Sequence, residues 1–222
     1  MIVVHHLENS RSQRILWFLE ELGVEYEVKR YARDVKTQLA PASLAKVHPL
    51  GKSPVITDGD RVIAESGNII EYLAVVYGEG RWIPALESAA HWDCKYWLHY
   101  GEGSLMPLLV MKLVFDKVKE SPMPFFIKPV AKGIANKVTE AYLGPNLQKN
   151  MDFIEGHLGN NAWFVGDALS AADIQMSFPL EAARSRYLHG RHYPNILAYV
   201  DKVQALPAYR RALEKGGPYD YA

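Results

Sequence analysis

The stretch that decides the fold of this chain is residues 53–68, which read SPVITDGDRVIAESGN. Two β-prone runs, Val55 to Thr57 and Arg61 to Ala64, flank an Asp-Gly-Asp turn. An Asp-Gly step between such runs is typical of a β-hairpin. Ser66 then stands where a helix N-cap would. Apolar residues recur behind it at helical spacing, at Ile69, Ile70, Leu73 and Tyr77. The stretch therefore predicts two antiparallel strands followed by a helix.

The preceding residues have the pattern of a βαβ unit. Ile2 to Val4 form a short apolar run, which is typical of a buried strand. Apolar residues at helical spacing run from Ile15 to Leu22, and Gly23 predicts the end of that helix. Tyr26 to Tyr31 is β-prone and alternates in polarity, which predicts a second strand parallel to the first. The order β-α-β followed by β-β-α is that of a thioredoxin-like domain.

The rest of the chain predicts helices alone. We expect an α/β thioredoxin-like domain over residues 1–78, a linker over 79–88 and an all-α C-terminal domain over 89–222. Helical patterns cover residues 88–117, 124–157, 171–188 and 194–214. Gly144-Pro145, Gly190 and Pro207 predict breaks between helices.

The composition excludes several classes of protein. The 222 residues carry 25 Lys and Arg against 25 Asp and Glu, so a broad basic surface for nucleic acid is not expected. A single cysteine allows no intrachain disulfide and fits a reducing compartment. Residues 1–6 contain no basic region followed by a long apolar stretch, so a secretory signal is not expected. The most apolar run, residues 105–115, is too short to span a bilayer. The missing targeting signals and the single cysteine predict a cytoplasmic protein. The histidines lack metal-ligand spacing, so a metal site is not expected.

Two features of the helical half are typical of packing rather than chemistry. Ser170 and Asp173 have the spacing of a capping box. Cys94 lies within an aromatic stripe, and such a cysteine is usually an unreactive small apolar residue. The stripe itself favours core packing or a subunit contact over a ligand site; its members are Trp92, Tyr96, Trp97 and Tyr100.

Three short segments that adjoin the predicted strands have the residues of a binding site. The first, residues 8–12, brings hydroxyl and amide groups to a helix N-terminus, where backbone donors favour an anion. A simple helix cap at Asn9 or Ser10 is the alternative. In the second, residues 48–55, a cis Ser53-Pro54 bond would expose the backbone of Ser53 to a peptide-like ligand. A plain strand-entry proline is the alternative.

The third segment holds the dipeptide Glu65-Ser66. The Ser66 hydroxyl and neighbouring amides suit a carboxylate, and Glu65 suits an ammonium group. Together they form a receptor for an amino-acid head group. The alternative is an N-cap next to a solvated glutamate.

In combination, the motifs resemble the cytosolic-type glutathione S-transferases, and within them a serine-type subgroup of fungi and bacteria. Five segments carry the resemblance, which extends over essentially the whole chain: NSR with RILW in residues 9–17, HPLGKSP at 48–54, AESG at 64–67, EGSL at 102–105 and MSFPL at 176–180.

The resemblance implies glutathione as co-substrate and assigns its contacts. Glu65 and Ser66 would hold the γ-glutamyl end, and the backbone at Ser53-Pro54 would pair with the cysteinyl part. Lys52 and, less directly, Gln38 would approach the glycine carboxylate. Residues between the two domains would form the electrophile site, with Tyr100, Ser104, Met106 and Leu109 as candidates. The family also implies a homodimer.

The thiol would then lie near Asn9, Ser10 and Arg11. Neither tyrosine nor cysteine occurs at this place, so Ser10 is the expected activating hydroxyl. The alternative is Asn9, which a different alignment would put where other serine-type members carry their serine. A free thiol with a pKa of about 8.5 is only ~3% ionised at pH 7. A hydroxyl donor, the helix N-terminus and Arg11 would stabilise the nucleophilic thiolate. It would attack an electrophilic carbon or a peroxide.

Two other function classes compete with conjugation. A glutathione-dependent disulfide or peroxide reductase would use the same thiol for exchange. A non-catalytic binding module would keep the fold alone, but an intact head-group receptor at Lys52, Ser53, Glu65 and Ser66 argues against it.

Overall fold

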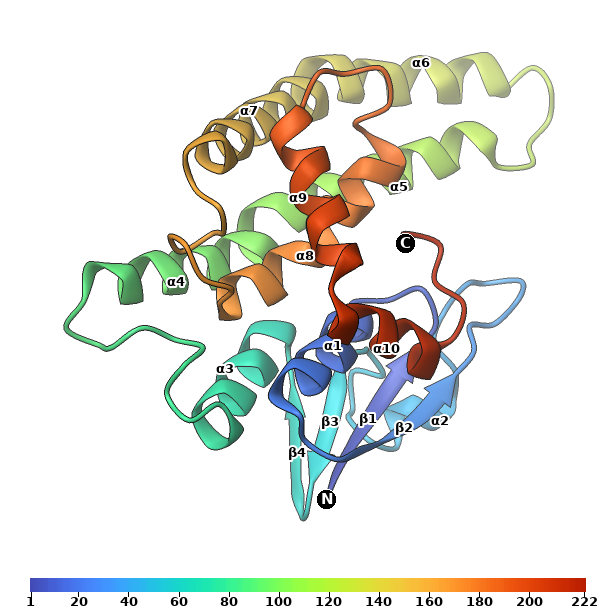
Figure 1. Ribbon diagram of the computed structural model, residues 1–222. Helices are drawn as coiled ribbons and strands as arrows, with labels where there is room; N and C mark the ends of the chain where they lie inside the picture. Colours follow the sequence, from blue (N-terminus) through green and yellow to red (C-terminus); the bar gives the residue numbers. More distant parts are fainter.

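A mixed four-stranded sheet forms the base of the computed structural model, which describes residues 1–222 (Figure 1). Its strands are β1 (Ile2–Leu7), β2 (Tyr26–Tyr31), β3 (Val55–Asp58) and β4 (Arg61–Ala64), in the spatial order β2-β1-β3-β4. β1 and β2 are parallel, and the other pairs are antiparallel. The predicted βαβ unit, hairpin and thioredoxin-like order are thus confirmed.

Helices α1 (Ser12–Leu22) and α3 (Ser66–Tyr77) accompany the sheet, and a short α2 (Ala42–Ala45) lies between β2 and β3. α1 ends as predicted, because Gly23 adopts a left-handed φ of 67° and its N–H donates to the carbonyl of Leu19. No helix or strand occurs between Tyr77 and Ala89.

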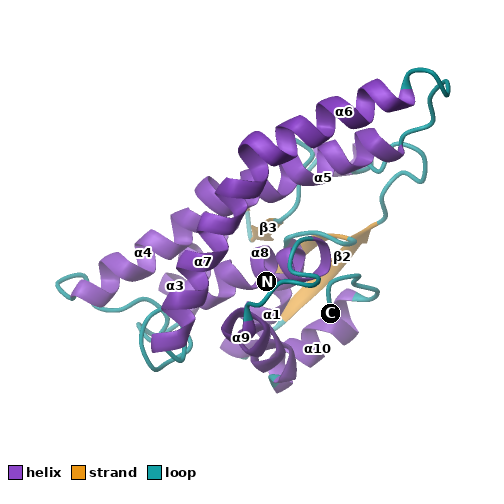
Figure 2. Cartoon of the chain, turned by 90° about the horizontal axis from the view of Figure 1, so that it is seen from above, coloured by secondary structure: helices purple, strands orange, loops and turns teal.

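The second half is entirely helical apart from its connections. It contains α4 (Ala89–Tyr100), α5 (Met106–Glu120), α6 (Lys128–Val138), α7 (Gly144–Asn160), α8 (Ala171–Arg186), α9 (Pro194–Ala205) and α10 (Pro207–Gly216). Two π-helical turns, η1 (Gly101–Leu105) and η2 (Thr139–Leu143), join α4 to α5 and α6 to α7. Figure 2 shows α5 and α6 side by side as a long hairpin.

The predicted break at Gly144-Pro145 is wrong, because the helical path runs without interruption from Lys128 to Asn160. In the π turn, the N–H of Gly144 donates to the carbonyl of Thr139, five residues back. Pro145 then falls in the first turn of α7, where a missing N–H costs nothing. The breaks at Gly190 and Pro207 are confirmed, since Gly190 lies in a turn and α10 begins at Pro207.

One continuous apolar core joins the two halves of the molecule. α8 runs through its centre, with every residue from Ala171 to Ala183 buried. The last helix returns to the first, because α10 packs against α1 (Figure 1). The ring centroids of Trp17 and Tyr209 lie 5.7 Å apart in this contact.

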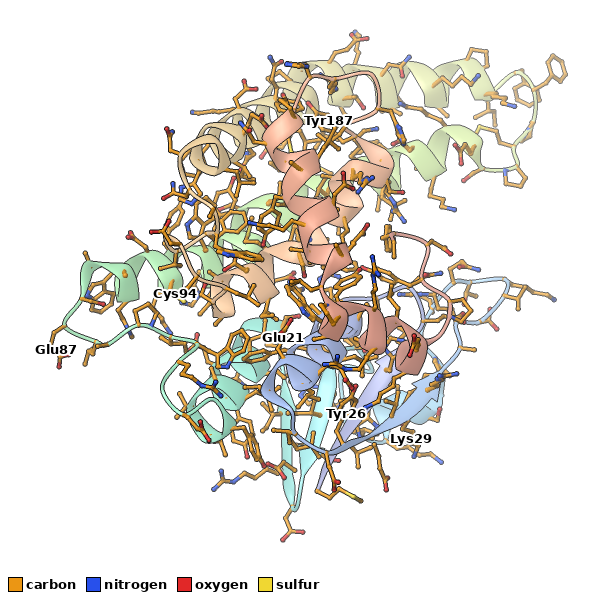
Figure 3. All side chains as sticks on the ribbon, viewed as in Figure 1. Glu21, Tyr26, Lys29, Glu87, Cys94 and Tyr187 are labelled. Carbon is orange, nitrogen blue, oxygen red and sulfur yellow. The ribbon has the colours of Figure 1, made fainter.

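The packing roles expected in the helical half are largely found. The Asp173 carboxylate accepts from the Ser170 N–H at 2.9 Å and from its hydroxyl at 2.8 Å, so this aspartate reaches back to the cap as predicted. Cys94 is buried on α4 (Figure 3), and burial raises the pKa of its thiol to about 11, as expected of an unreactive cysteine. No helix of the chain is both long and apolar enough to cross a bilayer.

Candidate functional site

Two of the three predicted segments are attached to the carboxyl end of β1. The Ser53 hydroxyl donates to the carbonyl of His5 at 3.0 Å and accepts from the N–H of Leu7 at 3.4 Å. From the first segment, Ser12 Oγ lies 3.4 Å from the carbonyl of Leu7. The Ser53-Pro54 peptide bond is cis, so the first of the two alternatives for this segment is confirmed. These bonds hold the segments around Ser10 and Ser53 at one edge of the sheet.

Arg14 of α1 connects the third segment to this edge. Its guanidinium is buried and donates to the Ser66 hydroxyl at 3.1 Å, to the carbonyl of Gln175 and to the carboxylate of Glu102. The prediction that Ser66 caps α3 is wrong: Glu65, with a φ of 69°, precedes the helix, and Ser66 is its first residue. The Ser66 hydroxyl serves instead as the acceptor for Arg14, while the Glu65 side chain is exposed.

Arg11 is not a free cation. Its Nε lies 3.0 and 2.9 Å from the two carboxylate oxygens of Glu102, which Arg14 also contacts. Burial opposes ionisation of Glu102, but the charges of Arg14 and Arg11 outweigh it and hold the pKa of this carboxyl below its usual value. Two guanidinium groups against one carboxylate leave a net charge of +1 beside the start of α1.

The two candidate activating residues have different partners. Asn9 has a left-handed φ of 49°; its Nδ2 donates to Asp220 Oδ2 at 2.8 Å, and its Oδ1 accepts from the Asp220 N–H at 2.9 Å. Ser10 is buried, and its Oγ accepts from the N–H of Ser12 at 3.3 Å. Asn9 therefore does not cap α1, whereas Ser10 accepts from its first N–H.

The residues expected near the glycine carboxylate are both exposed. Gln38 adopts a φ of 58°, and its side-chain amide donates to the carbonyl of Val35 at 3.2 Å. Arg33 ties this loop to the first segment, because it donates to the carbonyls of Gln38 at 3.0 Å and Asn9 at 3.4 Å. Lys52 is exposed on the loop before Ser53.

Three of the four residues expected to line the electrophile site are buried among other side chains. Tyr100 packs against Trp97 and Phe153 and donates to Asn150, so it belongs to the core of the helical half. Met106 and Leu109 are also buried in the core, whereas Ser104 is exposed. The spacing of these residues along the sequence does not reveal that α7 packs over Tyr100.

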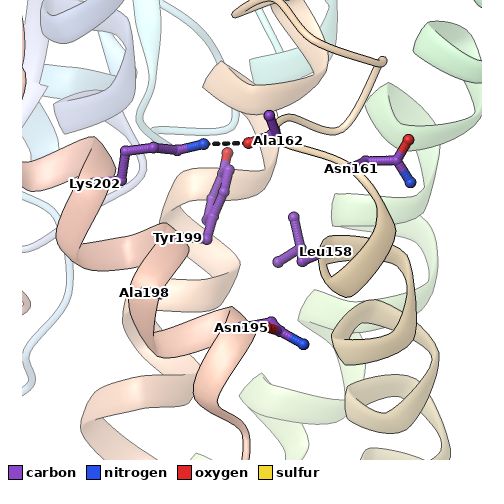
Figure 4. A pocket seen from close by; sticks show the side chains of 7 residues that line it. All are labelled: Leu158, Asn161, Ala162, Asn195, Ala198, Tyr199 and Lys202. Atoms are coloured by element: carbon purple, nitrogen blue, oxygen red, sulfur yellow. Dashed lines mark hydrogen bonds between the residues drawn. The ribbon is translucent and has the colours of Figure 1, made fainter.

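A cavity of about 170 Å³ lies elsewhere, between α7 and α9 (Figure 4). Lys202 extends across it and donates to the carbonyl of Ala162. None of the predicted site residues lines this cavity. No group of three or more His, Cys, Asp or Glu side chains is arranged to hold a metal ion.

Family models and known relatives match both halves of the chain. Residues 1–75 match the family model of the glutathione S-transferase N-terminal domain, and residues 113–207 match that of the C-terminal domain. Glutathione S-transferase 3 of Schizosaccharomyces pombe is 41% identical over 97% of this chain and 88% of its own length. Glutathione S-transferase 1 of Saccharomyces cerevisiae is 37% identical over 97% of this chain and 95% of its own.

The chain belongs to the glutathione S-transferase family. A crystal structure of a glutathione S-transferase from Actinobacillus pleuropneumoniae superposes with a TM-score of 0.81 at 34% identity, covering 100% of this chain and 95% of that one. A sphingomonad glutathione S-transferase, solved in complex with glutathione, has a TM-score of 0.73 at 20% identity over 97% and 98% of the two chains; this shows the shared fold. The chain is accordingly a glutathione transferase, and glutathione is its co-substrate.

Four residues of this glutathione S-transferase contact the predicted segments without having been assigned a role. Arg14 and Glu102 lie inside motifs that carry the resemblance, but a motif does not show that the two side chains meet. Arg33 and Asp220 carry no sequence signal. Asp220 lies 211 positions from Asn9, so only the folded chain reveals that pair.

Proposed function

We propose that the protein is a serine-type enzyme that conjugates glutathione to small electrophiles and also accepts hydroperoxides. The observation that carries this proposal is the attachment of the three segments to one another, through Ser53 to β1 and through Arg14 to Ser66. These bonds preorganise a peptide-binding edge beside the N-terminus of α1, and the exposed Ser104 is a candidate neighbour of the electrophile.

Each part of glutathione has a chemical counterpart at this edge. The ammonium of the γ-glutamyl group would pair with the exposed carboxylate of Glu65, and its carboxylate with the Ser66 hydroxyl and the first amides of α3. The backbone of Ser53 would pair with the cysteinyl part. The exposed Lys52 and Gln38 would contact the glycine carboxylate.

Two observations favour Ser10 over Asn9 as the group that donates to the thiolate. The Asn9 amide already donates to Asp220, and this carboxylate would repel a thiolate nearby. Ser10 stands at the N-terminal end of α1, where the helix dipole favours an anion. Arg11 would act through the cluster with Arg14 and Glu102, which carries a net positive charge.

The direct test is a titration of thiolate ultraviolet absorbance with glutathione bound to the purified protein, between about pH 5 and 9. A midpoint well below the free thiol value of about 8.5 supports activation. Ser10→Ala should raise this midpoint and leave glutathione affinity nearly unchanged. If Asn9→Ala raises it and Ser10→Ala does not, Ser10 is not the activating residue.

Glu65→Ala should weaken glutathione binding at least tenfold, because it removes the only proposed partner of the ammonium group. Isothermal calorimetry measures the affinity. Glu87→Ala, at an exposed glutamate of the 79–88 segment (Figure 3), serves as the matched control and should bind normally. Equal affinity of the Glu65→Ala and Glu87→Ala variants would refute the head-group role.

We further propose a homodimer, formed through an aromatic patch on α4 and α7. Trp92 is 63% exposed, Tyr96 49% and Phe153 47%, and the rings of Tyr96 and Phe153 lie 6.4 Å apart. Burying such a patch between two copies would remove it from water. Sedimentation equilibrium should give a dimer that the double substitution Trp92→Ser and Tyr96→Ser converts to monomer. Phe125→Ser, an exposed aromatic residue outside the patch, should remain dimeric.

The same proposal includes the domain limits and the compartment. A linker at residues 79–88 between domains 1–78 and 89–222 predicts that limited proteolysis cuts there first. One buried, reduced cysteine and a thiol co-substrate suit the cytoplasm. A fluorescent fusion that concentrates in an oxidising compartment would contradict this.

A further inference from the structure

A chain of three buried polar side chains runs from β1 to the start of α1. Ser10 Oγ lies 2.8 Å from Ser12 Oγ, and Ser12 Oγ lies 2.9 Å from His6 Nδ1. Ser10, Ser12 and His6 are 5%, 0% and 2% exposed. The glutathione contacts proposed above use neither Ser12 nor His6. Buried hydroxyl groups need hydrogen-bond partners. The direction in which each hydroxyl proton points decides whether this series of hydrogen bonds leaves the Ser10 proton free to bind a ligand.

The Ser12 hydroxyl has one proton, and its partners determine whether the proton of Ser10 is free. If His6 carries a proton on Nδ1, it donates to Ser12. Ser12 then donates to Ser10 Oγ, 2.8 Å away, in preference to the carbonyl of Leu7 at 3.4 Å, and the Ser10 proton remains available for a ligand. If His6 Nδ1 is bare, Ser12 donates to it, and Ser10 must donate inward to Ser12. The Ser12 N–H reaches Ser10 Oγ at 3.3 Å in either case.

The surroundings keep the imidazole neutral, so that it has one ring proton to place. Burial, and secondly the charge of Arg30, lower the pKa of His6 to about 4, and Glu8 opposes this only weakly. Arg30 lies opposite His6 in the β1–β2 register. At neutral pH a tautomer protonated on Nδ1 is therefore a fixed hydrogen-bond donor rather than a titrating group.

We propose that His6 and Ser12 are positioning residues for thiol activation: His6 Nδ1–H donates to Ser12, Ser12 donates to Ser10, and the Ser10 hydroxyl donates to the thiolate of bound glutathione. This inference rests on the proposed role of Ser10. The thiol proton leaves to solvent, and no proton moves along the chain. Hydrogen bonds aligned in one direction strengthen one another, so the bond to the anion gains from the two behind it.

The first experiment compares Ser12→Ala with Ser12→Thr. Ser12→Ala should raise the thiol pKa of bound glutathione by about one unit, a tenfold loss of thiolate well below that pKa, because Ser10 loses its aligned donor. The kcat should fall while the KM for glutathione stays constant. Ser12→Thr keeps a hydroxyl and should restore the wild-type thiol pKa. Ser177→Ala, which removes a buried hydroxyl that donates within α8, is the control for altered packing.

The outcomes separate this inference from the proposed function. If Ser10→Ala raises the thiol pKa and Ser12→Ala does not, the positioning role is wrong and the role of Ser10 stands. If neither raises it and Asn9→Ala does, both are wrong. Equal shifts in Ser12→Ala and Ser177→Ala would identify a packing effect and would also overturn the inference.

A second experiment tests the tautomer directly in the wild-type protein. Nitrogen-15 spectra of the histidine rings, assigned by comparison with His6→Asn, should show His6 protonated on Nδ1 and bare on Nε2 at neutral pH. The His6→Asn variant retains an amide donor and should keep a thiol pKa closer to wild type than His6→Leu does. A His6 ring protonated on Nε2 and bare on Nδ1 would overturn the proposed direction of the hydrogen bonds from His6 to Ser10.

Discussion

The carboxylate of Glu102 neutralises one of the two guanidinium charges beside the start of α1. It binds Arg11 and Arg14 together, and Arg14 in turn holds Ser66, so one carboxylate organises both predicted binding segments. The sequence predicts that Arg11 is the one charged side chain that stabilises the thiolate. In the structure Arg11 is part of an ion-pair cluster with Glu102 and Arg14, so its charge is shared among three side chains. The side chain of Glu102 is 29% exposed, which leaves it partly open to solvent.

Glu102→Gln should lower the free energy of unfolding by about 2 kcal/mol at pH 7, because it leaves buried Arg14 with an incomplete set of partners. The folded-state pKa of Glu102 is depressed, so the stability that its charge contributes is full above the unfolded value of about 4.5 and is lost as the pH falls through the folded value. Urea unfolding of wild type and variant should therefore differ at pH 7, and the difference should shrink as the pH falls below about 4.5 toward the depressed folded-state pKa. A difference independent of pH would contradict the ion pairing.

At the scale of elements, the π turn η2 allows α6 and α7 to form one helical path through a Gly-Pro pair. A Cβ on Gly144 would lie 2.9 Å from the backbone carbonyl of Thr139, so this position requires glycine for space. A Cβ on Gly133, in the exposed middle of α6, would meet nothing within 4 Å. The sequence marks Gly144 only as part of a Gly-Pro pair; that a side chain has no room at Gly144 and ample room at Gly133 is seen only in the structure.

Gly144→Ala should destabilise the protein by about 2 kcal/mol, because the backbone of the π turn must shift to admit a methyl group. Gly133→Ala should stabilise it by up to about 1 kcal/mol, since alanine is the better helix former in open space. Thermal or urea unfolding of both variants measures the difference. Equal effects of the same sign would show that the π turn is not under this steric limit.

For the whole molecule, the segment after α10 joins the helical half to the segment proposed to activate the thiol. Tyr219 donates to Glu181 of α8 at 2.6 Å, and the carbonyl of Tyr221 accepts from Gln204 of α9 at 3.0 Å. Between them, the Asp220 carboxylate accepts from Asn9 Nδ2, and the Asp220 backbone N–H donates to Asn9 Oδ1. The last residues of the chain thus hold residues near its beginning.

Asp220→Ala should loosen residues 8–11, because Asn9 in its left-handed conformation loses the hydrogen bond from its Nδ2 to the Asp220 carboxylate, while the bond from the backbone N–H of residue 220 and the Arg33 contact remain. Hydrogen exchange at the backbone amides of this segment should become several-fold faster. Asp201→Ala, which removes an exposed ion pair with Arg184, is the control and should leave these amides unchanged. Unchanged exchange in Asp220→Ala would mean that the carboxylate of Asp220 does not order the segment.

By itself, the sequence determined the features that depend on neighbours along the chain. The hairpin at residues 55–64, the stop at Gly23 and the start of α10 at Pro207 follow from turn chemistry and helix periodicity over a few residues. The tertiary structure alone decided which side chains meet across long separations: Ser66 accepts from Arg14, Asp220 binds Asn9, and α7 covers Tyr100. Local patterns carry no information on such pairs, because they form only when distant segments return to a shared core.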